Sequence, residues 1–324
     1  LSDPTAGEGK GALTTVERAP RGHAFNVLAC AQVTARNATM PTPPALAEPP
    51  DAPRPDAPNA VVGRSPLAWA AALTLLSLLA LVLPAWRLFD STEGYLPLHT
   101  GLEMFSIAVS ALVFAQAWSL RHLRGDAHRQ LLGTALLAVG LIDLAHTLSF
   151  AGMPAWVTPS SADKAINFWL AGRLVAAAAL LAVVSPNRRE WSPVTALCSA
   201  LALAAAVWWV GLVHPNWLPG TFLAGQGPTG LKIGIEHALF ALYGLAAVLP
   251  WRRARRDGDT EWAWLAAAAW VLGLAELLLS LHTDATDHFN LFGHVYKTGA
   301  YVMIYRALFV ASAQQPYREL ALQQ

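Results

Sequence analysis

The chain has 324 residues, of which 55% are hydrophobic and only 13% are charged. Soluble domains carry about 25% charged residues, so this composition excludes an ordinary soluble globule and favours an integral membrane protein. The formal net charge of +1 gives no overall field that would attract nucleic acid, and no nucleic-acid partner is expected.

The first 65 residues differ from the rest of the chain. They lack helical periodicity, and the stretch 41–60 is dense in proline, alanine and aspartate. Such a composition buries too little apolar surface to offset the entropy of ordering, so residues 1–65 are predicted to form a disordered tail. The first methionine is Met40, and residues 1–39 are therefore interpreted as an upstream translation artefact or the edge of a fragment.

Apolar segments dominate the remaining chain. A membrane-spanning helix needs about 20 mostly apolar residues. Eight segments approach that length: 67–86, 98–119, 131–152, 165–184, 193–213, 231–250, 262–282 and 291–311. Their short connections make consecutive helices antiparallel. The predicted fold is an all-α, polytopic transmembrane bundle over residues 66–312, followed by a cytoplasmic linker helix over 313–324.

Lysine and arginine are distributed unevenly among the connections between these segments. The first and third connections contain one basic residue each, Lys232 lies at the end of the fifth, and the seventh contains no basic residue. The even-numbered connections are richer, with Arg121, Arg124, Arg129, Arg188, Arg189, Arg252, Arg253, Arg255 and Arg256. Because basic loops remain on the cytoplasmic side, both termini are predicted to be cytoplasmic.

Ionisable side chains interrupt the apolar segments, and the predicted orientation places them in the outer half of the bundle. A charge at the centre of a bilayer costs about 2.5–3.5 kcal/mol even on the mildest scale, so such groups persist when they face one another, a water-filled cavity or a ligand. Their clustering predicts one polar site for a ligand or signal near the extracytoplasmic surface. The residues that carry this prediction are His99, Glu103, Asp143, His146, Arg173, Glu236, His237, Glu276, His282, His294 and Lys297.

Each of these residues also has an ordinary explanation. His99 and His282 could be interfacial residues at helix ends, and Lys297 could extend towards the headgroups. Arg173 could pair with one acid and join two helices. The one-sided distribution of the whole set favours a single polar site over these separate explanations.

The four acids in this layer outnumber its two fixed cations, Arg173 and Lys297. Protons on the acids, charged histidines or a bound cation could balance the excess. Histidine with carboxylate suits zinc, copper or iron, and Asp143 has the spacing to orient His146 by a hydrogen bond, as carboxylates do for histidines that bind metals. A metal ion or haem is therefore one interpretation, although the sequence contains no recognised chelate motif. The candidate metal ligands are His99, His146, His237, His282, His288 and His294.

Four blocks follow one another in the chain: HTGLEMFSIAVSALVFAQAW (99–118), LLAVGLIDLAHTLSFAGMP (136–154), NFWLAGRL (167–174) and HVYKTGAYVMIYRALFVASAQQPYREL (294–320). In this order they resemble the type-three MASE family of bacterial membrane-associated sensor domains. The resemblance covers about residues 67–320. By motif position it carries over four pairs of site residues: His99 with Glu103, Asp143 with His146, Trp169 with Arg173, and His294 with Lys297.

The resemblance implies a sensory input domain in the bacterial inner membrane. Such domains are typically fused to a cytoplasmic output, such as a PAS domain, a histidine kinase of a two-component system, or a diguanylate cyclase that makes cyclic di-GMP. Residues up to Gln324 show no kinase, GGDEF or PAS pattern, so the output is expected beyond this segment or on a separate partner, and the chain itself is not expected to be an enzyme. A homodimer is a further expectation.

The expected mechanism is that a ligand, ion or proton at the outer polar site shifts the bundle between two packings, and that the last helix relays the shift. Two alternatives remain open on the residues alone. Intramembrane acids and bases also mark proton- or ion-coupled transporters, and histidines with an acid within a helical bundle also occur in membrane-embedded metal-dependent hydrolases.

Overall fold

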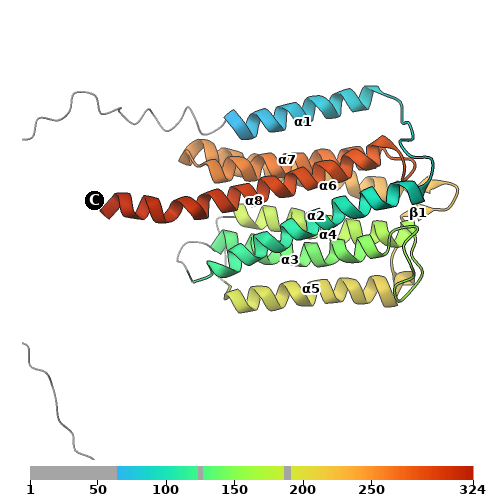
Figure 1. Ribbon diagram of the computed structural model, residues 1–324, viewed down its shortest axis with the longest axis horizontal. Coiled ribbons are helices and arrows are strands. Elements are labelled where there is room, and N and C mark those ends of the chain that lie inside the picture. Colours follow the sequence, from blue (N-terminus) through green and yellow to red (C-terminus); the bar gives the residue numbers. More distant parts are fainter. Residues whose placement is uncertain (1–63, 123–126, 186–190, 324) are drawn as a thin grey trace, which may run out of the picture. The chain divides into compact units, whose positions relative to one another are not determined.

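The computed structural model describes residues 64–122, 127–185 and 191–323 of the chain (Figure 1). The predicted tail lies outside the described residues except for its last two, and so do Arg124, Arg188 and Arg189 of the predicted cytoplasmic loops. The described part contains eight long helices: α1 (Arg64–Val82), α2 (Thr92–Ser119), α3 (Ala127–Leu148), α4 (Ala162–Val184), α5 (Pro193–Val213), α6 (Gly230–Asp257), α7 (Thr260–Ser280) and α8 (His288–Gln323). The predicted all-α bundle is confirmed.

Short irregular elements occupy the connection between α5 and α6. A 3-10 turn, η1, covers Pro215–Trp217, and the two-residue strands β1 (Phe222–Leu223) and β2 (Gly227–Pro228) pair antiparallel. Five of the long helices begin at a side chain that accepts a hydrogen bond from their first-turn backbone, which satisfies a donor that the helix leaves free. These capping residues are Ser91, Ser161, Ser192, Thr229 and Asp259.

Seven of the helices, α1 to α7, are long and apolar enough to cross a membrane. The chain is therefore a multi-pass membrane protein in contact with the lipid bilayer. The eighth predicted span corresponds to the first part of α8, which is less apolar because it carries His294, Lys297 and Arg306. It nevertheless packs within the bundle, against α7 and α2.

Six of the eight helices form a closed ring. Going around it, α2 packs against α3, α3 against α4, α4 against α6, α6 against α7, α7 against α8, and α8 against α2. The other two lie outside the ring, α1 against α7 and α5 mainly against α3, and Figure 1 shows them at opposite margins of the bundle. Every helix of the ring supplies polar side chains to its interior.

Small residues bring neighbouring helices of the ring close together, as is common in membrane proteins. Gly172 of α4 faces α3, where a side-chain carbon at this position would lie 3.1 Å from Asp143 Oδ1. Gly273 of α7 faces α6, where an added carbon would lie 3.3 Å from Tyr243 Cβ. Gly293 of α8 faces α7, where an added carbon would overlap the Leu279 side chain.

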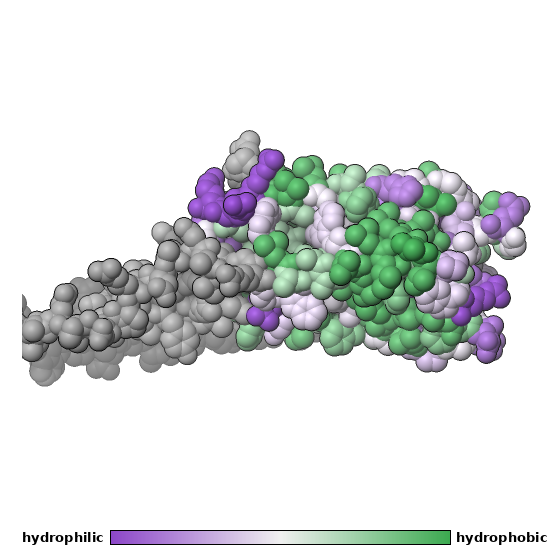
Figure 2. Space-filling model, turned by 90° about the horizontal axis from the view of Figure 1, so that it is seen from above, coloured by the Kyte–Doolittle hydropathy of each residue, from purple (hydrophilic) through white to green (hydrophobic). Residues whose placement is uncertain are grey.

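On the face shown in Figure 2, apolar side chains cover most of the described bundle, and hydrophilic residues gather mainly towards its two ends. At the end that contains the connections α1–α2 and α7–α8, Leu88 N donates to Thr286 O at 2.9 Å and Arg87 pairs with Asp284 at 3.1 Å. The pKa of Asp284 lies below its usual range. Partial burial raises this pKa, but the hydrogen bonds from the Thr286 backbone and hydroxyl and the charge of Arg87 together lower it by more. We call this end the capped end.

Candidate ligand-binding site

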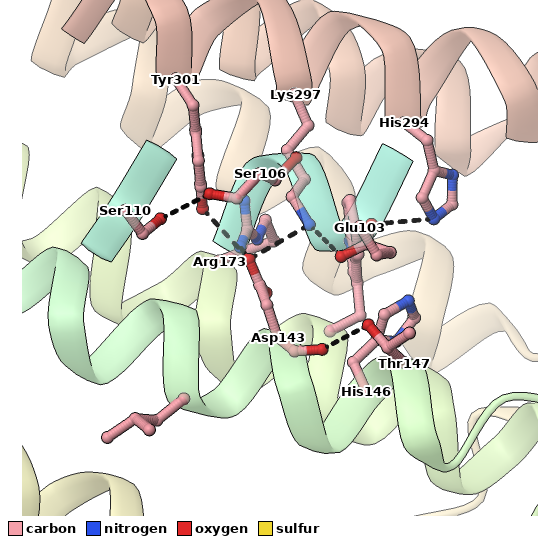
Figure 3. Close-up of polar contacts among 12 residues, drawn as sticks. Glu103, Ser106, Ser110, Asp143, His146, Thr147, Arg173, His294, Lys297 and Tyr301 are labelled. Atoms are coloured by element: carbon pink, nitrogen blue, oxygen red, sulfur yellow. Dashed lines mark hydrogen bonds and ion pairs between the residues drawn. The ribbon is translucent and has the colours of Figure 1, made fainter. Parts of the chain in front are cut away.

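The interior of the ring contains a continuous chain of ion pairs (Figure 3). Arg173 of α4 donates from Nη2 to both carboxylate oxygens of Asp143 on α3, at 2.7 and 2.8 Å. Lys297 of α8 contacts two carboxylates, Asp143 at 3.1 Å and Glu103 of α2 at 2.5 Å. All four residues are at most 1% exposed. Four helices are thereby joined through charges that water does not reach.

Aromatic rings surround the two buried cations. The Trp169 ring lies 4.8 Å from Arg173 Cζ and 4.8 Å from Lys297 Nζ, and the Tyr301 ring lies at 5.4 and 5.8 Å from the same two atoms. Both rings are within the range of cation–π attraction. The Tyr301 hydroxyl also donates to Asp143 at 3.4 Å, and the Tyr243 hydroxyl donates to the Arg173 carbonyl at 2.9 Å.

Three histidines lie next to this chain of ion pairs, on the side nearer the capped end. His99 Nε2 is 3.3 Å from His146 Nε2, and His294 Nε2 is 3.6 Å from Glu103 Oε1. Phe150 stacks on the His99 ring at 3.9 Å. The three imidazoles are at most 3% exposed. We call His99, Glu103, His146 and His294 the histidine cluster, and these residues together with Asp143, Arg173 and Lys297 the central site.

A second buried group lies between α6 and α7. Lys232 pairs with Glu236 at 2.7 Å and donates to the Leu279 carbonyl at 2.6 Å. Its Nζ is also 3.0 Å from His282 Nδ1. The same Nδ1 also lies 2.6 Å from the Leu279 carbonyl, so it is placed between an ammonium donor and a carbonyl acceptor. The predicted site residues Glu236 and His282 therefore belong to a separate polar group.

The remaining predicted residues have different surroundings. Glu276 of α7 accepts from Trp169 Nε1 at 3.4 Å, which places it beside the central site. His237 is exposed, and its Nε2 contacts Ser280 Oγ at 3.2 Å. His288 stacks against Trp86 at 3.8 Å, near the capped end. Of the six histidines considered as metal ligands, the structure brings three together, His99, His146 and His294, and places the other three elsewhere.

Sequence reasoning missed three residues with clear roles in these groups. Tyr301 follows Lys297 by four residues, and this helical spacing could have placed it beside the site. Tyr243 stands among apolar residues of α6, and its spacing gives no such indication. Lys232 opens the predicted segment 231–250 and was counted with the basic residues of the preceding connection, whereas in the structure it is 1% exposed within α6. Its spacing to Glu236 is the i, i+4 pattern of a helical ion pair and could have identified it.

Several buried polar atoms of the central site have no hydrogen-bond partner among the described residues. They include His99 Nδ1, Glu103 Oε1 and His294 Nε2. Buried polar atoms are nearly always paired with protein, water or a ligand, so these atoms mark where an additional group would bind. Nitrogen and carboxylate oxygen donors at these positions can accept protons or coordinate a metal ion.

A comparison with known protein families identifies the family of the chain. The profile of the MASE3 family, described as a membrane-associated sensor domain, matches residues 91–316. This range contains every residue of the central site, five helices of the ring in full and α8 as far as residue 316, and it excludes α1. No curated protein and no solved structure shows significant similarity to the chain.

Proposed function

Because the chain belongs to the MASE3 family of membrane-associated sensor domains, we propose that it is the sensory input domain of a bacterial signal-transduction protein and that its signal binds at the central site. A sensor domain is not itself catalytic. The proposed location is the inner membrane, with both termini cytoplasmic and the capped end outside. The loop arginines that the structure describes support this orientation, since Arg121, Arg252, Arg253, Arg255 and Arg256 lie at the end opposite the capped end.

The observation that carries this proposal is the position of Lys297 on α8. Its ammonium bridges Glu103 of α2 and Asp143 of α3, and α8 has 36 residues. A helix of that length measures about 54 Å, well beyond the roughly 30 Å of the bilayer core. One helix thus contacts the buried charges at one end and extends beyond the membrane at the other.

Buried ion pairs suit a helix that can adopt two arrangements, as proposed for α8. Removing two charges from water is costly, and their attraction repays that cost only when the geometry is good. A ligand that contacts the site in one arrangement of α8 and not in the other shifts the balance by its difference in affinity. We propose that the output is a PAS domain, a histidine kinase or a diguanylate cyclase, in cis or in trans, and that two copies of the domain pair in the membrane.

The two alternatives have less support. A transporter needs polar groups along both halves of the bundle, whereas the central site and the Lys232–Glu236 pair lie towards the capped end. Among the described residues, the buried polar side chains of α3 and α7 near the other end are fewer: Gln130, Thr134 and Glu261. A hydrolase needs an open metal position that substrate can reach, whereas the histidine cluster is at most 3% exposed. Assays of substrate uptake and lipid hydrolysis with purified protein would distinguish these activities from sensing.

The test is to replace Lys297→Met in the signalling protein that contains or partners this domain. Coupling free energies between two sites are typically about 1–3 kcal/mol. If α8 couples the site to the output by that amount, the ratio of output with signal to output without signal should fall about 5–150-fold in the Lys297→Met variant. Lys297→Arg retains the cation and should keep part of the response.

The matched control is Lys232→Met, because Lys232 is an equally buried lysine that also pairs with a glutamate but lies outside the central site. Membrane insertion and expression of each variant are measured in parallel. A Lys297→Met protein that inserts normally and retains the full response would contradict the proposal, as would an equal loss in Lys232→Met.

A further inference from the structure

We propose that the histidine cluster binds one divalent first-row transition-metal ion, with zinc(II) the best match, and that this ion is the ligand of the central site. This inference rests on the proposed function for its meaning in signalling, but the binding site itself stands on geometry. Its four ligands are His99 and Glu103 of α2, His146 of α3 and His294 of α8.

The distances within the cluster suit a single small ion. One donor atom from each of the four residues lies within 4.8 Å of those from the other three. Zinc–nitrogen bonds of about 2.0–2.1 Å in a tetrahedron put neighbouring donors about 3.3 Å apart. The separation of 3.3 Å between His99 and His146 equals that value, and the 3.6 Å between His294 and Glu103 is close to it.

The backbone fixes the two histidines on α3 and α8 in the form that a metal requires. His146 Nδ1 lies 2.8 Å from the Ala165 carbonyl, and His294 Nδ1 lies 2.8 Å from the Asn290 carbonyl. A carbonyl only accepts, so each Nδ1 carries the proton and each neutral ring directs the lone pair of Nε2 into the cluster. Metal-bound histidines almost always make this second contact, which sets ring orientation and tautomer.

Glu103 is oriented in the same way by a neighbouring group. Lys297 binds its Oε2, and this leaves Oε1 without a hydrogen-bond partner although the residue is 1% exposed. His294 Nε2 is also buried without a hydrogen-bond partner, because 3.6 Å is too long for a hydrogen bond. An ion between these two atoms would satisfy both of them.

The ligand chemistry indicates the class of ion. Three imidazoles and one carboxylate suit zinc, copper, iron or nickel, whereas magnesium and calcium prefer oxygen ligands. The described cysteine, Cys198, is exposed on α5 and outside the cluster, so no thiolate would take part. The two acids Glu103 and Asp143 face Arg173 and Lys297, and Glu276 lies beside them through its contact with Trp169.

A bound ion would join α2, α3 and α8 through a second point, beside the bridge that Lys297 already makes between Glu103 and Asp143. It would draw His294 of α8 towards His99 and Glu103 of α2. Since Glu103 also binds Lys297, coordination of Oε1 changes the charge that Lys297 experiences. Metal binding and the position of α8 would then depend on the same carboxylate.

The experiment uses the full chain, purified in detergent through an affinity tag without histidine and stripped of metal by chelator. Titration with Zn²⁺ and elemental analysis after gel filtration should give one ion per chain. His294→Gln should weaken Zn²⁺ binding by at least about 10–100-fold, because loss even of a group that only orients a ligand has that effect. His282→Gln, a change to a histidine of similar burial in the other polar group, should leave binding unchanged.

If His294→Gln fails to fold, the ligands of the ion can be identified in the unmodified protein by X-ray absorption at the zinc edge. Four nitrogen or oxygen neighbours with imidazole scattering are expected. Absence of stoichiometric binding by the folded protein, sulfur scattering, or equal loss in His282→Gln would overturn the inference. Tighter binding of Cu²⁺ is expected from the general affinity order and supports a transition-metal site.

Failure of this inference and failure of the proposed function give different results. If the folded protein binds no metal but Lys297→Met still removes the signal response, the sensing role remains and the signal has other chemistry. If the ion binds as expected but His294→Gln and Lys297→Met leave the response intact, the metal site exists and the sensing role of the central site is wrong.

Discussion

Arg173 and Asp143 show how a charge is retained inside a membrane helix bundle. Both are 0% exposed, and two donor–acceptor contacts from one nitrogen join them. Trp169 and Tyr301 add their ring faces to the guanidinium. Each group is tolerated only because the other is present, so the pair acts as one unit in the energetics of folding.

Arg173→Met should therefore lower the free energy of unfolding by about 3–5 kcal/mol, because it leaves the Asp143 carboxylate buried and uncompensated. The double change Arg173→Met with Asp143→Leu should cost less than the single one. The measurement is chemical or thermal unfolding in detergent. The exposed Arg255→Met serves as the control and should change stability by no more than about 0.5 kcal/mol. Equal stability of the Arg173→Met variant and the unmodified protein would show that the pair is dispensable.

At the scale of single helices, α8 depends on glycine for its contact with α7. Gly293 faces Leu279 so closely that a side-chain carbon would overlap it, whereas nothing lies within 4 Å of the corresponding position at Gly299. These two glycines are six residues apart on the same helix and have opposite environments. They provide a matched pair for testing the packing of α8.

Gly293→Ala should destabilise the protein by about 1–3 kcal/mol, because extra volume in a packed interior forces its neighbours to move. Gly299→Ala should instead raise stability by up to about 1 kcal/mol, since alanine favours helix over glycine. Thermal unfolding of both variants in the same detergent provides the comparison. Equal effects of the two changes would contradict the close α7–α8 contact.

The existence of the helices could be predicted from the sequence because the apolar runs have the length of a membrane span. Their ends could not. The second span was predicted to begin at residue 98, but α2 begins at Thr92 because Ser91 caps a polar first turn. The sixth was predicted to end at residue 250, but α6 continues through Pro250 to Asp257. Hydropathy does not report capping, and it undervalues polar turns that remain helical outside the apolar layer.

For the candidate site, the sequence indicated the side of the bundle but not the grouping. His99, Glu103, Asp143, Arg173 and Lys297 could be placed at similar depth by counting residues, and the structure brings them together. The assignment of Glu236 and His282 to a different group depends on which faces of α6 and α7 meet. The rotation of each helix about its own axis decides which faces meet, and it is set by packing against helices that are far apart in the sequence. The spacing of residues within one helix does not indicate that packing.

The part of the molecule that the structure describes is a ring of six helices with α1 and α5 outside it. This arrangement explains why the polar residues come from α2, α3, α4, α6, α7 and α8, since only those helices have a face towards the interior. It also explains why α1 and α5 have many exposed apolar side chains, which in a bilayer would contact lipid. Which end of the ring faces the cytoplasm is a prediction that labelling can test.

Single cysteines introduced in a background of Cys30→Ser and Cys198→Ala allow this test. Ala224→Cys lies in the exposed hairpin between β1 and β2 at the capped end, and Arg255→Cys lies at the opposite end of α6. A membrane-impermeant maleimide applied to intact bacterial cells should label the first and not the second, and cell lysis should make both reactive. The reverse pattern would invert the orientation and place the central site on the cytoplasmic side.

The hydrogen bond from Leu88 to Thr286 and the ion pair of Arg87 with Asp284 have a kinetic consequence. The imidazoles of the histidine cluster are at most 3% exposed and lie towards the end where these two connections are linked, so a solute that enters from that end has to pass them. The rate of arrival and departure would then be limited by how often the connections separate. A sensor with this geometry would average over rapid fluctuations of its signal and respond to sustained exposure.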